Sequence, residues 1–342
     1  MKKLRVVLVL LVGDLLLFLT CAAVADAERD RPLPRLSDYG FFEGALTDLR
    51  PAADVHAYAL NTPLFSDYAH KARFVYVPAD SSLGWQDREV LDMPVGAVLI
   101  KHFYYPADER DPDGERRFVE TRLLKHTEGG WRAYGYWWDD DQLDAKYKPL
   151  GGKADVDFVN ARGETRHIDY ASPNQIQCKS CHSYDGEIRP IGPSARQLHG
   201  GEHSYLSDWA DSGLLRGAPS GKTWPVMDWR ADGISVELAA RAYLDANCGY
   251  CHRAEGPAST SGLMLAWDTP TGPLTGVLKS PVAAGKGSGG RTYDVEPGHP
   301  ERSILVYRLE STDAAVRMPE VGRTVADEEG LAVVRAWIEG ME

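Results

Sequence analysis

Two pentapeptides in this chain carry residues capable of covalent cofactor chemistry. Each is a C-x-x-C-H motif, in which two thiols form thioether bonds to a porphyrin and the following histidine ligates its iron. With 5 Cys and 10 His in 342 residues, chance places Cys at +3 and His at +4 of a given cysteine with a probability of roughly 0.0004. The sequence therefore predicts two covalently bound haem c groups. The attaching cysteines are Cys178, Cys181, Cys248 and Cys251, and the proximal iron ligands are His182 and His252.

A zinc site is the alternative interpretation, because two C-x-x-C pairs could supply four thiolates to one tetrahedral metal ion. A zinc ribbon needs no histidine directly after each pair, and it usually spaces the pairs more closely than the 70 residues between Cys178 and Cys248. The haem interpretation is favoured for both reasons.

The amino terminus predicts export to the periplasm. A basic start with Lys2, Lys3 and Arg5 precedes an apolar run over residues 6–19 and several small residues, which together form the pattern of a signal peptide over residues 1–27. Asp14 within the apolar run argues against an uncleaved membrane anchor, because a charge near the bilayer centre is costly.

Cys21 leaves one alternative, a lipid anchor. It is the weaker one, because Phe18 and Thr20 stand where the lipidation box normally has small or Leu-like residues. If Cys21 is removed with the signal peptide, every remaining cysteine lies in a C-x-x-C-H motif and none is left for a disulfide. No second segment is long and apolar enough to cross a membrane, so we expect no transmembrane segment in the mature chain.

The chain is acidic, with a formal net charge of −12 over 342 residues. Removing residues 1–27 takes away three basic and two acidic side chains, which leaves −13. This charge argues against nucleic acid as a partner and favours basic redox proteins. The length suits about two domains.

Residues 28–177 predict a β-rich domain of antiparallel strands. Glu128-Gly-Gly130 and Ala161-Arg-Gly163 supply hairpin turns, and the aromatic run over residues 131–138 is interpreted as sheet packing. The predicted strands are Arg73 to Val77, Ala97 to Tyr105, Arg117 to Lys125, Trp131 to Trp138, Val156 to Asn160 and Thr165 to Tyr170.

The carboxy-terminal residues predict helices. Ser235 can cap a helix from Val236 to Asn247 that leads directly into Cys248. A second helix opens at Thr324-x-x-Asp327, and Met318-Pro319 precedes it.

This pattern resembles a class I cytochrome c domain over residues 233–342. The resemblance implies His252 as proximal ligand and Met318 as distal ligand, with Met264 and Met341 as competing core methionines. The expected fold is therefore α+β with two domains. The β-rich domain (28–177) is followed by a first haem-binding segment and linker (178–232), then by an all-α class I cytochrome c-like domain (233–342).

The mature chain as a whole resembles a family of exported bacterial dihaem c-type cytochromes. The resemblance covers nearly all of it. The segments that carry it are Leu36-Ser-Asp-Tyr-Gly-Phe-Phe42, Asn61-Thr-Pro-Leu-Phe-Ser-Asp-Tyr-Ala69, Glu120-Thr-Arg-Leu-Leu124, Pro173-Asn-Gln-Ile-Gln-Cys-Lys-Ser-Cys-His182, Ile191-Gly-Pro193 and Ala242-Tyr-Leu-Asp-Ala-Asn-Cys-Gly-Tyr-Cys-His252.

The distal side of the first haem stays open at this stage. Lys101 and His102 alternate in one strand and so face opposite sides of the sheet. A fainter similarity links the strand of Lys101 to small c-type cytochromes in which a lysine cross-links to a haem that oxidises hydroxylamine. The candidates, besides no ligand at all, are Met93, Lys101, His102, His126, His167, His199, His203 and Met227.

Two functions from different classes follow. The first is an electron-transfer protein that passes single electrons between redox partners. The second is a haem enzyme, in which an open first haem acts on a nitrogen oxide, hydroxylamine or peroxide while the second haem conducts electrons. The favoured expectation is the electron carrier, with donor and acceptor unidentified.

Overall fold

The computed structural model describes residues 30–199, 204–219 and 228–342. Its largest element is a six-stranded antiparallel sheet of order β1-β2-β4-β5-β6-β7. The predicted signal peptide, Cys21, His203 and Met227 lie outside the described residues. The strands of the sheet are β1 (Val55–Tyr58), β2 (His70–Tyr76), β4 (Val98–Pro106), β5 (Arg116–Thr127), β6 (Gly130–Trp138) and β7 (Ala145–Tyr147).

Every predicted strand is present, and no bound differs from its predicted position by more than three residues. β8 (Lys153–Val159) and β9 (Thr165–Ala171) pair as a separate antiparallel hairpin. Its turn contains Gly163 at φ 81°, a conformation that glycine adopts without strain. The turn before Gly130 joins β5 to β6, as expected.

The two faces of the sheet bury different cores. Phe74, Ile100, Leu123 and Tyr136 point to one face and are buried with residues of the 36–46 segment. That segment contains the single turns η1 (Ser37–Tyr39) and η2 (Leu46–Asp48). The aromatic run over residues 131–138 mainly packs the sheet, because Tyr134, Tyr136 and Trp138 are all buried in this core.

The opposite face carries one apolar cluster at each end. At one end Val75, Leu99 and Leu124 pack with residues of α3 (Ala195–Leu198) and α4 (Tyr205–Asp211). At the other end Phe103 packs under the β8–β9 hairpin. Two short pairs complete this region, β3 (Leu83–Gly84) with β12 (Leu215–Arg216) and β10 (Ser183–Tyr184) with β11 (Glu187–Ile188).

The carboxy-terminal part contains α5 (Val236–Leu244), α6 (Ile304–Glu310) and α7 (Glu328–Glu339). The Ser235 side chain accepts a hydrogen bond from the Leu238 amide, which confirms the predicted cap of α5. The cap of α7 is Asp327, three residues later than the predicted opening at Thr324, because its carboxylate accepts from the Gly330 amide.

The predicted all-α class I cytochrome c-like domain is wrong. The described chain is mainly β-rich, with six α-helices of four to twelve residues. Between α5 and α6 the chain forms a π-helical turn over residues 245–249, single 3₁₀ turns and irregular loops. Seven glycines from Gly262 to Gly298 have positive φ, so this stretch folds as successive turns rather than helices.

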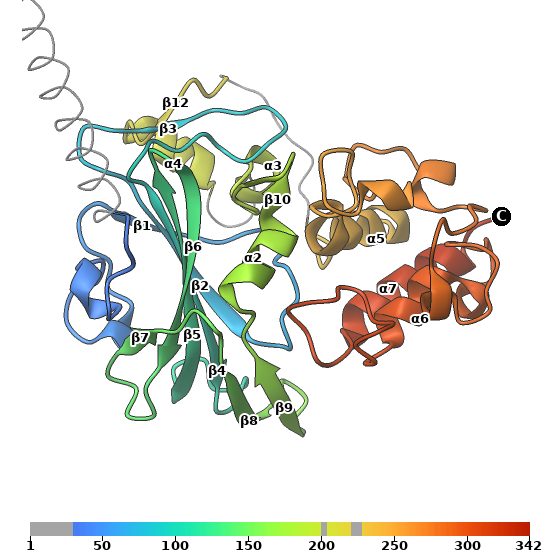
Figure 1. Cartoon of the computed structure of the whole chain (residues 1–342), viewed down its shortest axis with the longest axis horizontal. Coiled ribbons are helices and arrows are strands. Elements are labelled where there is room, and N and C mark those ends of the chain that lie inside the picture. The colour runs from blue at the N-terminus through green and yellow to red at the C-terminus, as the bar shows by residue number, and fades with distance from the viewer. Residues whose placement is uncertain (1–29, 200–203, 220–227) are drawn as a thin grey trace, which may run out of the picture.

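The carboxy-terminal part lies beside the sheet, and α2 (Gln175–His182) lies between them (Figure 1). Among the described residues, no helix is both long and apolar enough to cross a membrane.

Candidate haem-binding sites

The first C-x-x-C-H motif forms the last turns of α2. Asn174 caps this helix by accepting from the Gln177 amide, and the Gln177 side chain accepts from the Asn174 amide in return. This capping box fixes the start of a helix of only eight residues. The helix packs on β6, so Cys178 contacts the apolar cluster on that face of the sheet.

His182 is prepared to act as a metal ligand. Its Nδ1 lies 2.8 Å from the Arg189 carbonyl oxygen. A carbonyl only accepts, so Nδ1 carries the proton and Nε2 keeps its lone pair, as in ligating histidines whose second nitrogen is held by a backbone oxygen. Burial, followed by the nearby Lys101 ammonium, lowers the pKa of His182 to about 4. The imidazole is therefore neutral near pH 7.

A cavity of about 580 Å³ adjoins this motif and is lined by Cys178, Cys181 and His182. This volume falls within the range of cofactor and ligand pockets. The wall from the sheet includes Leu99, Leu124, Trp131 and Ala133, and Ile188 and Tyr250 line it from other elements. The first motif thus has two thiols, a neutral imidazole and a cavity with one apolar wall together, which fits a covalently held haem.

The second motif begins in the π-helical turn that follows α5. Cys248 is 8% exposed and packs in the core of the carboxy-terminal part. Burial raises the pKa of its thiol to about 12. Asn247 anchors the turn, because its amide donates to the Tyr243 carbonyl and its side-chain oxygen accepts from the Phe65 amide.

His252 has a similar arrangement of its ring nitrogens. Its Nδ1 lies 3.2 Å from Ser261 Oγ, and that hydroxyl donates its own proton to the Ala258 carbonyl at 2.7 Å. Ser261 therefore accepts from Nδ1 of His252. The donor set of the second motif also fits a haem.

Met318 is half-buried in the segment that precedes α7. Its amide donates to Arg308, and its carbonyl accepts from Arg323 at 2.7 Å. Residues just after Met318 lie near the second motif. The Glu320 carboxylate helps to raise the pKa of the Cys251 thiol, and Val321 lines the same cavity as Tyr250. The assignment of Met318 as distal ligand stays a prediction.

The two motifs contact each other. The Cys251 thiol lies 3.9 Å from the Ser180 carbonyl oxygen of the first motif. The proximity of the two thiols lowers the pKa of Cys181 to about 7 and raises that of Cys251. The Asp185 amide donates to the Glu255 carbonyl at 2.9 Å, and the Arg253 guanidinium lies 4.7 Å from the ring centre of Tyr184. Attachment sites 70 residues apart in sequence are therefore neighbours in space.

The structure separates the distal-ligand candidates of the first haem. Three candidates line the cavity beside His182, namely Met93, Lys101 and His126. His126 donates from Nδ1 to the Met93 carbonyl at 2.8 Å and stacks on Trp131, so its Nε2 is free. His199 is half-buried and is not among the residues that line this cavity.

His102 faces the other side of the sheet. It is fully buried among Phe42, Phe74 and Phe118, and its Nδ1 is hydrogen-bonded to Thr121. Burial lowers its pKa to about 3, so it is a neutral core residue away from the first motif.

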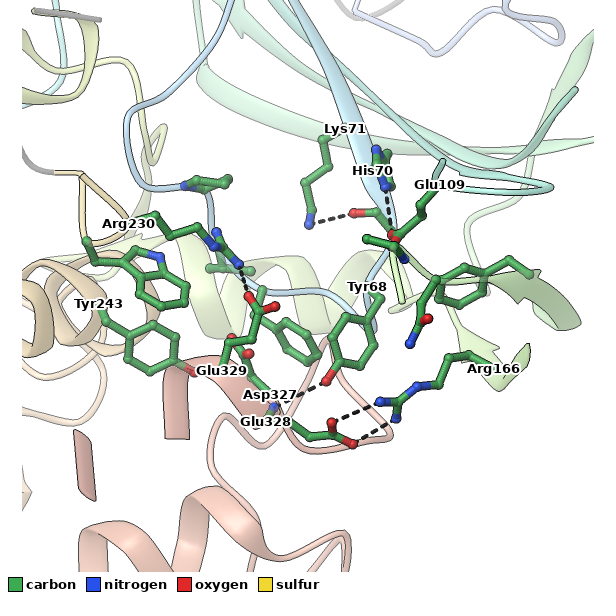
Figure 2. Close-up of a pocket in the computed structure, with 18 of the residues that line it drawn as sticks. Tyr68, His70, Lys71, Glu109, Arg166, Arg230, Tyr243, Asp327, Glu328 and Glu329 are labelled. Atoms are coloured by element: carbon green, nitrogen blue, oxygen red, sulfur yellow. Dashed lines mark hydrogen bonds and ion pairs between the residues drawn. The ribbon is translucent and has the colours of Figure 1, made fainter. Parts of the chain in front are cut away.

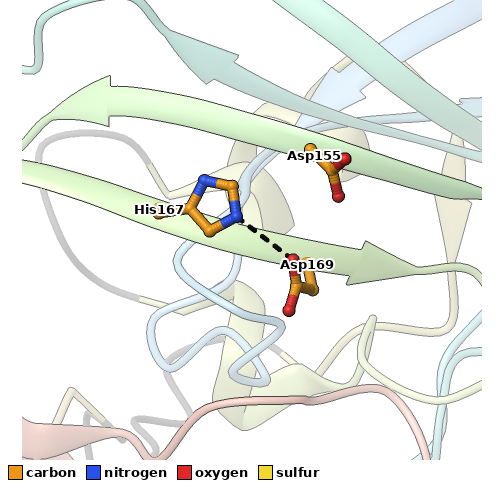
Figure 3. A group of neighbouring side chains, drawn as sticks. All are labelled: Asp155, His167 and Asp169. Atoms are coloured by element: carbon orange, nitrogen blue, oxygen red, sulfur yellow. Dashed lines mark hydrogen bonds and ion pairs between the residues drawn. The ribbon is translucent and has the colours of Figure 1, made fainter.

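His167 belongs to an exposed group on the β8–β9 hairpin (Figure 3). Its ring nitrogens lie 2.8 Å from Asp157 and 3.1 Å from Asp169. Asp155, His167 and Asp169 are the one set of three potential metal ligands within 4.8 Å of one another in the described chain. The cysteines of the two motifs form no such set, so the four-thiolate zinc alternative lacks its geometry here.

A second cavity, of about 470 Å³, lies where β2, β9 and α7 meet (Figure 2). Arg166 holds Glu328 at the start of α7 through two hydrogen bonds of 2.7 and 2.9 Å. Asp67 accepts from the amides of Thr324 and Val325 nearby. These contacts fix the carboxy-terminal part against the sheet and thereby hold the two motifs together.

Sequence reasoning missed a row of cations on the cavity face of the sheet. Arg73, Lys101 and Arg122 lie directly opposite one another on β2, β4 and β5. Burial, followed by the nearby guanidinium groups of Arg122 and Arg73, lowers the pKa of Lys101 to about 7. The available signal was an arginine or lysine on the same face of each of three neighbouring strands.

Comparisons with protein families, curated proteins and solved structures find no match to this chain.

Proposed function

We propose that this chain is an exported dihaem c-type cytochrome that passes single electrons between redox proteins of the periplasm. Haem iron supplies the one-electron chemistry when it is bound. Cys178, Cys181 and His182 would hold the first haem. Cys248, Cys251, His252 and Met318 would hold the second.

The observation that carries this proposal is the contact between the two motifs, in which Cys251 Sγ lies 3.9 Å from the Ser180 carbonyl oxygen and the Asp185 amide donates to the Glu255 carbonyl at 2.9 Å. A protein that conducts electrons through two cofactors needs them close together, and these contacts bring the two attachment sites side by side. The two imidazoles also support the proposal, because both His182 and His252 donate from Nδ1 to an oxygen atom, as ligating histidines commonly do.

The resemblance to exported dihaem cytochromes and the signal-peptide pattern support a periplasmic location as part of the same proposal. The net charge of −13 after removal of residues 1–27 favours donors and acceptors with a basic docking surface.

A haem enzyme is the second candidate function, and the cavity of about 580 Å³ beside His182 favours it. Such a cavity could admit a small nitrogen oxide, hydroxylamine or peroxide to an open iron. The electron carrier is preferred because His126, with a free Nε2, lines the same cavity and can fill the sixth position.

Spectroscopy of the purified protein separates the two functions. For a carrier, the ferric protein has only low-spin EPR signals and the reduced protein binds no carbon monoxide. Met318→Ala is the matched control, because it should open the second haem and make carbon monoxide binding visible. A high-spin signal in wild type, with carbon monoxide binding that His182→Ala abolishes, would replace the carrier with the enzyme.

A further inference from the structure

The cation row is unusual because its charges are removed from much of the solvent and repel one another. Arg73 is 9% exposed, and Lys101 and Arg122 are half-buried. Cross-strand neighbours have Cβ atoms only about 4.5–5.5 Å apart, so like charges there repel. Lys71 adds a fourth cation two residues from Arg73 on the same strand face.

One carboxylate compensates this row. Glu120 accepts from Arg122 Nε and Nη2, both at 2.8 Å. Within the described residues, Arg73 and Lys101 have no carboxylate partner, and the Lys71 ammonium donates to the Ala69 carbonyl. Three cations in a row therefore share a single anion.

Two other carboxylates that line the cavity are paired with arginines outside the row. Asp245 pairs with Arg196 at 3.1 Å, and Glu89 pairs with Arg253 at 2.7 Å. Buried charges in proteins are normally paired, so the row lacks the anion that its burial requires.

We propose that Arg73, Lys101 and Arg122 form a binding site for an anionic group with two or more oxygen atoms, a carboxylate or an inorganic oxyanion. Guanidinium groups bind such anions through paired N–H donors, and a lysine adds a point charge. All three side chains line the cavity that holds Cys178 and His182. The anion is either a propionate of the first haem, which rests on the proposed function, or a small oxyanion from solution.

The first arm of the test measures free oxyanion binding to the purified full-length protein. Inorganic phosphate is titrated at fixed ionic strength into wild type, Arg73→Met, Lys101→Met and the control Arg132→Met, by calorimetry. Arg132 is an exposed arginine on β6 of the same sheet. We expect phosphate to bind wild type and Arg132→Met alike, and about tenfold or more weakly to the two cavity variants.

The second arm detects a propionate. If a propionate fills the site, phosphate does not bind wild type. Arg73→Met and Lys101→Met then shift the propionate bands in resonance Raman spectra and lower one midpoint potential, because a nearby cation favours the reduced haem. Arg132→Met should change neither. If Arg73→Met fails to fold, Arg73→Lys replaces it in both measurements, because it keeps the positive charge but loses the paired N–H donors of the guanidinium.

The proposal is overturned if phosphate affinity, Raman bands and potentials of both cavity variants all match those of Arg132→Met. A purified protein without covalent haem would refute the proposed function but not the anion site. Phosphate binding to that protein would still test whether Arg73 and Lys101 bind an anion.

Discussion

Replacing Glu120 by glutamine should destabilise the protein substantially. Glu120 is 1% exposed, and its carboxylate accepts from Arg122 at two oxygens and from the Tyr170 hydroxyl at 2.8 Å. Removing one partner of a buried ion pair costs about 3–5 kcal/mol. Glutamine still accepts one hydrogen bond, so we expect the low end, about 3 kcal/mol, which lowers Tm by roughly 6–12 °C.

The pH dependence gives this prediction a second readout. Burial acts to raise the pKa of Glu120, but the Arg122 guanidinium and hydrogen bonds together hold it below the ordinary glutamate value. A carboxylate whose pKa is lowered by folding stabilises the protein at pH values above its ordinary pKa. This stabilisation is lost as the pH falls through the lower pKa of the folded state. The gap between wild type and Glu120→Gln should therefore be largest near pH 7 and shrink below about pH 4.

The assay is thermal unfolding followed by circular dichroism, with Glu128→Gln as control. Glu128 is exposed in the β5–β6 turn, so its substitution should leave Tm nearly unchanged. The reasoning about the cation row is refuted if the two variants unfold at the same temperature, or if the gap is independent of pH.

Three further predictions concern the iron ligands and the contact between the two parts of the chain. His126→Ala should open the first haem, giving a high-spin EPR signal and carbon monoxide binding; an unchanged spectrum would exclude His126 as ligand. Met318→Ala should lower the potential of the second haem and remove the weak sulfur-to-iron band at the red edge of the ferric spectrum, and survival of that band would assign another ligand. Asp67→Ala leaves the Thr324 and Val325 amides without their acceptor, and each unsatisfied amide should lower the free energy of unfolding in urea by about 1–3 kcal/mol. A loss no larger than that of the exposed control Asp113→Ala would contradict this.

The strands were predictable because apolar and aromatic residues alternate with polar ones and glycine turns separate them. Position 102 shows the limit of this signal. Alternation places Lys101 and His102 on opposite faces, but only the packing around Phe42 and Phe118 shows that His102 lies in the core. The cation row also needed the register, since Arg73, Lys101 and Arg122 are far apart in sequence.

The carboxy-terminal prediction failed for a different reason. Helical patterns at Val236–Leu244 and Glu328–Glu339 are present in the structure, but they were extended to the whole segment between them. Glycines such as Gly276, whose φ is 99°, instead direct that segment into turns. The proximity of Cys181 and Cys251 could not be predicted from the sequence either. It depends on the packing of α2 on the sheet and on the position of the turn after α5.

The proposal that both C-x-x-C-H motifs bind haem is tested most directly by the number of covalent haems on the mature protein. The protein is produced with its export signal in a host that attaches haem c, then measured by intact mass and the pyridine haemochrome assay. We predict a mass increase of two haems. The double variant Cys178→Ala/Cys181→Ala and the double variant Cys248→Ala/Cys251→Ala should each carry one haem. A mass without haem, or zinc bound in place of iron, would contradict it.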